Sequence, residues 1–150
     1  MDFLMEQALL YSSEKYAEIY RHFNQKLDMK YQDLFIVCAS IGFKNDRKST
    51  FEKRSRELRT NFFNTNQKAI FYSIVLSDPE LGRDIERFDE REFKLNARKL
   101  IELYAEGGMD ILVEEVFGSR WDGYKLDETY NEYEVDVLGY IYNDAQSIPF

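Results

Sequence analysis

The side chains that most often carry out catalysis are scarce in this chain. It has one histidine, His22, and one cysteine, Cys38, too few for the usual zinc sites. Cys38 lies in the apolar run 34–39 with no basic neighbour to lower its thiol pKa, so we expect a buried structural thiol. His22 falls in a helical pattern and is expected to be a surface or half-buried side chain. We therefore predict no catalytic residue, no metal and no cofactor.

Acidic residues are abundant, and one arrangement of them matches a magnesium-dependent nuclease on paper. Asp78 or Asp84 followed by Glu92 and Lys94 reproduces an Asp…Glu-x-Lys pattern, in which the acids hold the metal and the lysine stabilises developing charge. That pattern works from adjacent β-strands, whereas residues 83–106 follow helical periodicity. A solvated helix face is the favoured interpretation, and a metal-dependent nuclease stays as the second alternative.

A basic segment spans residues 44–59, where seven basic and three acidic side chains give a local charge of +4. Its cations are Lys44, Arg47, Lys48, Lys53, Arg54, Arg56 and Arg59. They are candidate contacts for nucleic-acid phosphates, with Phe51 available for stacking. A solvated loop, a short exposed helix or a docking patch for an acidic partner are the other interpretations. The net charge of the whole chain, −8, opposes strong binding to nucleic acid by this protein alone.

The C-terminal third has the opposite character. Residues 107–150 hold ten acidic and two basic side chains, a charge of −8, so the net charge of the protein resides there. This part is also rich in large aromatic residues, which are favoured anchors of protein interfaces. The candidate partner-binding residues are Trp121, Tyr124, Tyr130, Tyr133, Tyr140 and Tyr142. One helix face cannot bury all of them, so we expect some in the core and some at a partner-binding surface.

The elements that must position these residues are predicted to be mostly helical. A length of 150 residues with 44% hydrophobic residues and only two prolines predicts one compact domain of about five to seven helices. Residues 1–28 form its N-terminal part, with helix over 2–26 and a break at Ser12–Glu14. The run 31–43 predicts a buried helix ended by Gly42, with a buried strand as the alternative.

The remaining elements are delimited by caps and glycines. Asn64-Thr65-Asn66 is expected to cap one helix, and residues 77–80 are expected to end that helix and start the next. Residues 83–106 are expected to form one helix, or two with a break near Asp89. Gly107-Gly108 predicts the end of a helix. Residues 118–126 are expected to form a loop, and Asp127 or Thr129 is expected to cap a last helix. Residues from 145 onward are expected to be loose, and 143–150 form a tail.

The start of the chain is acidic where a signal peptide needs positive charge. No apolar run approaches the roughly 20 residues that cross a bilayer. We therefore expect a cytoplasmic protein that does not contact membranes.

Two stretches of the chain resemble a known family. Residues 31–48 are similar to the block Y-x-D-L-x-V-F-A-A-x-x-G-F-K-x-x-R of the Dnd system-associated protein 4 family. Residues 103–112, with Gly107-Gly108 followed by Ile111-Leu112, resemble that family's second block. The resemblance covers about residues 30–142. It implies a bacterial accessory protein encoded beside DNA phosphorothioate modification and restriction genes, with related subunits in other antiphage systems.

The leading hypothesis is thus a non-enzymatic accessory subunit of an antiphage DNA-targeting complex. It would bind a larger ATPase or nuclease subunit through apolar and aromatic surface, with the basic segment 44–59 near DNA. A direct nucleic-acid-binding protein that uses this segment is the first alternative.

Overall fold

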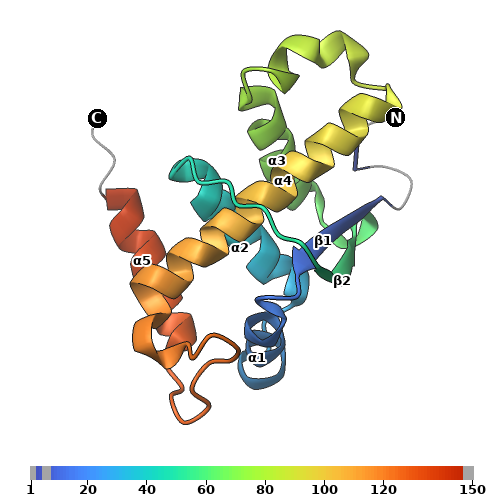
Figure 1. Ribbon diagram of the computed structural model, residues 1–150. Coiled ribbons are helices and arrows are strands. Elements are labelled where there is room, and N and C mark those ends of the chain that lie inside the picture. The colour runs from blue at the N-terminus through green and yellow to red at the C-terminus, as the bar shows by residue number, and fades with distance from the viewer. Residues whose placement is uncertain (1–2, 5–7, 147–150) are drawn as a thin grey trace.

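The computed structural model describes residues 3–4 and 8–146. In that part of the chain, five α-helices and one two-stranded sheet form a mostly helical domain, which confirms the predicted fold class (Figure 1). The longest helix, α4 (Arg91–Leu112), crosses α2 (Tyr31–Lys44). These two helices make the most extensive contact in the molecule, and the other elements pack around them.

The small sheet corrects two predictions. Strand β1 (Leu9–Ser13) replaces part of the helix expected over 2–26, and β2 (Arg54–Arg59) lies in the segment expected to be a loop or exposed helix. The strands are antiparallel, with Leu10 opposite Leu58, and both of these side chains are buried. The partner strand lies more than 40 residues away in the sequence, so local periodicity could not reveal the pairing. Helix α1 (Ala17–Leu27) follows the expected break.

The run 31–43 is a helix, not a strand, and it makes up all of α2 but the last residue. Leu34, Phe35 and Cys38 are fully buried. Gly42 does not end this helix, and Gly107-Gly108 does not end α4; both predicted stops are wrong.

The three glycines instead lie where α4 meets α2 and the segment that follows α2. A Cβ on Gly108 would lie 1.7 Å from the carbonyl oxygen of Cys38, and one on Gly42 would lie 2.0 Å from that of Tyr104. A Cβ on Gly107 would lie 2.0 Å from the Arg47 carbonyl oxygen. Glycine inside a helix costs about 1 kcal/mol relative to alanine. Here it permits backbones to approach to a distance that any side chain would prevent.

The cap predicted at Asn64 is confirmed. Asn64 Oδ1 accepts a hydrogen bond from the Gln67 amide at 2.8 Å, and Gln67 Oε1 accepts one from the Asn64 amide at 3.0 Å. This capping box begins α3 (Thr65–Ser77). A 3₁₀ segment, η2 (Leu81–Arg87), follows where an α-helix was expected, and α4 begins after the predicted break near Asp89.

The C-terminal part wraps around the end of α4. A π-helical turn, η3 (Val113–Phe117), and a 3₁₀ turn, η4 (Gly118–Arg120), lead into a loop closed by a bridge between Trp121 and Leu126. Helix α5 (Tyr133–Gln146) follows. Neither predicted cap, Asp127 or Thr129, is used, because α5 begins at Tyr133. Asp127 Oδ1 accepts a hydrogen bond from the Thr129 amide at 2.9 Å in a turn before the helix.

None of the helices in the described ranges is long and apolar enough to cross a membrane. Of the tail predicted to be loose, residues 147–150 lie outside the described part, and residues up to 146 belong to α5.

Candidate interaction surfaces

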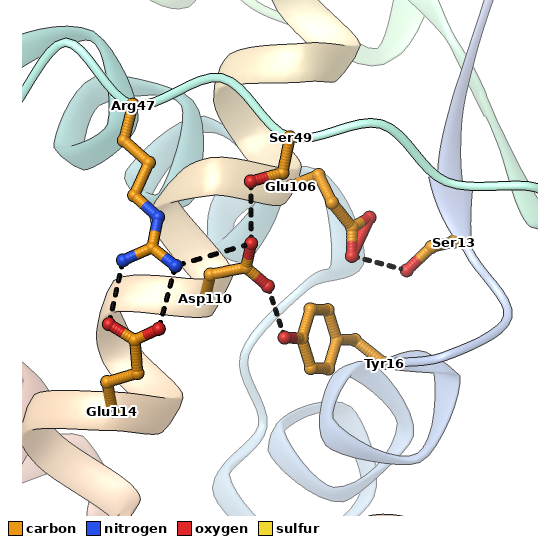
Figure 2. A network of polar contacts seen from close by, with 7 residues as sticks. All are labelled: Ser13, Tyr16, Arg47, Ser49, Glu106, Asp110 and Glu114. Atoms are coloured by element: carbon orange, nitrogen blue, oxygen red, sulfur yellow. Dashed lines mark hydrogen bonds and ion pairs between the residues drawn. The ribbon is translucent and has the colours of Figure 1, made fainter.

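Helix α4 carries a stripe of acidic side chains at a spacing of four residues. Its members are Glu102, Glu106, Asp110 and, in the following turn, Glu114. Residues four apart lie on the same side of a helix, and this side faces β1, the start of α1 and the segment after α2 (Figure 2). The stripe therefore joins three parts of the chain that are distant in sequence.

The inner half of the stripe is buried. Glu102 Oε2 accepts the Tyr11 amide at 2.8 Å, and Glu106 Oε1 accepts the Ser13 hydroxyl at 2.8 Å. Burial raises the pKa of both carboxyl groups, that of Glu106 to about 7, because removal from water disfavours the charged form. The Ser13 and Tyr11 hydrogen bonds oppose that rise. These two acids hold β1 against α4.

The outer half of the stripe engages the basic segment. Asp110 accepts hydrogen bonds from the Tyr16 hydroxyl and, at 2.6 Å, from the Ser49 hydroxyl. The Arg47 guanidinium makes two hydrogen bonds of 2.7 Å to the Glu114 carboxylate (Figure 2). This pairing lowers the pKa of Glu114 and raises that of Arg47. Arg47, predicted as a nucleic-acid contact, is thus paired with an acid of its own chain.

Two further cations of the predicted basic segment also face the chain itself. Lys44 Nζ lies 3.2 Å from a carboxylate oxygen of Asp144 on α5. Lys48 Nζ lies 5.7 Å from the centre of the Tyr104 ring. Lys53 is exposed and precedes β2. In the first half of the segment, Lys44 and Arg47 are thus paired with acids of the C-terminal third.

The three arginines of β2 remain at the surface. The Arg54 guanidinium lies 4.3 Å from the centre of the Tyr11 ring, and that of Arg56 lies 3.6 Å from the centre of the Tyr31 ring. Arg59 is exposed. Arg54 lines one hollow, and Arg56 and Arg59 line another.

A hollow of about 520 Å³ beside Arg54 collects cations that the sequence pattern did not connect. Arg98 and Lys99 of α4 line it together with Arg54, Tyr11 and the buried Glu102. None of the three cations forms an ion pair with another described residue. Sequence analysis missed Arg98 and Lys99 because they lie on a different element from the basic segment.

The predicted partner-binding aromatics divide between core and surface. Tyr133 is fully buried, and its hydroxyl donates to the Asp127 carbonyl at 2.7 Å, so it belongs to the core. Trp121, Tyr130 and Tyr140 are half-buried and pack against the core. Tyr124 and Tyr142 are exposed.

The outer side of α5 is more apolar than the aromatic residues alone suggested. Val135, Leu138 and Tyr142 are 61%, 59% and 65% exposed. Ile141 and Ala145 of the same helix line a groove of about 290 Å³ together with residues of α2 and α3 such as Val37 and Ile70. Apolar surface thus extends from α5 across to α3.

Of the acids in the proposed nuclease arrangement, Asp78 and Glu92 have described side chains, whereas that of Asp84 lies outside the described part. Asp78 Oδ2 accepts the amides of Glu80 and Leu81 and shapes a turn. Glu92 lies in the first turn of α4, a helix instead of the strand that the motif needs. The described residues contain no group of three or more His, Cys, Asp and Glu side chains able to hold a metal ion.

His22 is half-buried on α1, where its ring lies 5.3 Å from that of Tyr133 in an edge-to-face arrangement. Desolvation lowers the pKa of His22.

Comparison with known proteins identifies the family. The family model described as DNA sulphur modification system-associated protein 4 matches residues 13–129. The chain belongs to this family. Membership associates it with a DNA sulphur modification system and so implies other components of that system as its context. Searches of the curated proteins and of the solved structures gave no match.

In this member of the DNA sulphur modification system-associated protein 4 family, the matched residues include all three glycines of the α2–α4 contact and the acidic stripe of α4. The match begins earlier than the resemblance in the sequence suggested, and it ends before α5.

Proposed function

We propose that this protein is a non-enzymatic accessory subunit that binds a larger component of a DNA sulphur modification system. The observation that carries the proposal is the exposed apolar side of α5, formed by Val135, Leu138 and Tyr142. Three large apolar side chains on one helix face, each more than half exposed, form the kind of patch that marks a protein interface. The groove beside Ile141 extends this patch.

The acidic side chains of α4 support an adaptor over an enzyme. Glu102 and Glu106 accept hydrogen bonds from residues of β1. Asp110 accepts hydrogen bonds from Tyr16 and Ser49, and Glu114 accepts them from Arg47. Their hydrogen bonds and ion pairs fasten separate segments of the chain together. These acids therefore have a role in holding the fold together. The surface that we propose for other proteins lies elsewhere, on α5.

Co-expression tests the proposal. The tagged chain is produced together with the other proteins of its DNA sulphur modification system, and the retained proteins are identified. We expect one larger component to be retained by the wild type and lost with Leu138→Ser combined with Tyr142→Ser. Phe62→Ser combined with Leu76→Ser is the matched control, because it removes two exposed apolar side chains elsewhere. A wild-type chain that retains no component of the system would contradict the proposal.

Direct contact with nucleic acid is a second candidate function, favoured by the hollow beside Arg54. Its three cations form no ion pair with another described residue, so they suit phosphate groups. If this hollow binds DNA, Arg54→Glu combined with Lys99→Glu should abolish the binding of labelled DNA at low salt. Arg21→Glu combined with Lys26→Glu on α1 makes the same change of charge elsewhere and should leave more of the binding. Absence of binding by the wild type at low salt would exclude this function for the free protein.

A further inference from the structure

Helix α5 contains a glycine that the packing of the described chain does not explain. Gly42, Gly107 and Gly108 each lie where a Cβ would collide with a neighbouring backbone. A Cβ on Gly139 would meet nothing within 4 Å. Its φ is not positive, so no special backbone conformation requires glycine there. Glycine in a helix interior lowers helix stability, and nothing within the described chain compensates for it at this position.

Gly139 lies within the exposed apolar side of α5. Val135, Leu138, Gly139 and Tyr142 follow the spacing i, i+3, i+4, i+7, which places them on one face of a helix. This is the pattern by which a helix contacts a second helix. In the α2–α4 contact, glycines at the centre of such a face bring the two backbones together.

We propose that the outer face of α5 receives a helix of a partner protein, which crosses α5 at Gly139. The inference rests on the proposed accessory function and names the surface and the kind of partner. The absence of a side chain at Gly139 would allow the partner's backbone to approach closely. Val135, Leu138 and Tyr142 would pack around the crossing point and bury their exposed surface.

The charges around α5 indicate the chemistry of that partner. The helix itself contains acidic residues and no basic residue from Tyr133 to Gln146, and Glu132 and Glu134 are exposed. A second copy of this chain would bring these acids close to one another, which is unfavourable. A helix with an apolar face flanked by Lys and Arg would complement both the exposed apolar side chains and the acidic charges of α5. The partner is therefore a basic amphipathic helix.

A graded increase in side-chain size at Gly139 tests this inference. Affinity is measured between the chain and the component of the DNA sulphur modification system that it retains on co-expression. We expect Gly139→Ala to weaken binding several-fold and Gly139→Leu to weaken it at least tenfold. Both variants should unfold at the wild-type temperature or a few degrees above it, because alanine and leucine favour helix more than glycine does. Glu132→Lys combined with Glu134→Lys should also weaken binding.

Ser73→Leu is the matched control, since it places leucine at an exposed position of α3, and it should bind as the wild type does. If the wild type and Gly139→Leu bind the component equally, this inference is wrong while the accessory function stands. If the wild type binds no component, both are wrong. If the wild type forms a dimer that Gly139→Leu abolishes, the partner is a second copy, which overturns the basic helix.

Discussion

Helices α4 and α5 contain the same kinds of residue in very different surroundings. Each has a glycine in its interior, apolar side chains at helical spacing and several acidic residues. On α4, Gly107 and Gly108 are pressed against the backbone of Arg47 and Cys38. The acids of α4 accept hydrogen bonds from β1, α1 and the segment after α2. On the outer side of α5, the glycine faces open space and the apolar side chains are exposed.

The difference separates a helix that is covered by its own chain from one whose outer face is uncovered by the described residues. Glycine lowers the stability of a helix, and burial removes water from a carboxyl group; on α4, neighbours in the same chain compensate for both. The corresponding features on the outer face of α5 have no such neighbours among the described residues. That contrast makes α5 the most suitable surface for another protein.

Alanine at Gly108 should have the largest effect. Its Cβ would lie 1.7 Å from the Cys38 carbonyl oxygen, so α2 and α4 must separate along their contact. We expect a loss of about 3 kcal/mol or more in the free energy of unfolding, measured by urea denaturation, or failure to fold. A Gly108→Ala variant within about 1 kcal/mol of the wild type would show that the two helices do not approach so closely.

Replacement of Glu106 by glutamine should change how stability depends on pH. Because the folded protein raises the pKa of Glu106 to about 7, it binds a proton there more tightly than the unfolded chain does. Wild-type stability should therefore fall as pH rises from about 5 to 8, by up to about 3 kcal/mol from this group. Glu106→Gln should remove that part of the slope in urea denaturation across this pH range.

Glu134→Gln on α5 is the control for Glu106→Gln, since Glu134 is exposed. Its slope should match that of the wild type. An unchanged slope in Glu106→Gln would mean that water reaches this carboxyl group in the folded protein.

Alanine at Gly139 should have the smallest effect on stability, and in the opposite direction. The new methyl group meets nothing within 4 Å, so the gain in helix propensity should stabilise the isolated protein by about 1 kcal/mol in urea denaturation. The contrast in sign with Gly108→Ala is the direct test of the difference between the two helices. A destabilised Gly139→Ala variant would indicate that the outer face of α5 is already packed against another part of the protein.

Features that depend on neighbours in the sequence could be predicted. Asn64 and Gln67 are three residues apart, and their capping box forms from side chains that reach only the adjacent backbone. The helix expected to follow the break at Ser12–Glu14 likewise corresponds to α1. Of the candidate partner-binding residues, Tyr142 is at the surface, whereas Tyr133 is in the core. Composition cannot tell which side of a helix faces inward.

What the sequence by itself determined was the helical class, the cap at Asn64 and the opposite charges of two regions. These follow from propensity, from hydrogen bonds between near neighbours and from counting charges. The tertiary structure decided whether Gly107-Gly108 ends a helix or lies in a contact, because only the approach of α2 distinguishes the two. It likewise paired Arg47 with Glu114 and left Gly139 uncovered. Each of these outcomes depends on residues far apart in sequence, whose distance is set only when the chain folds.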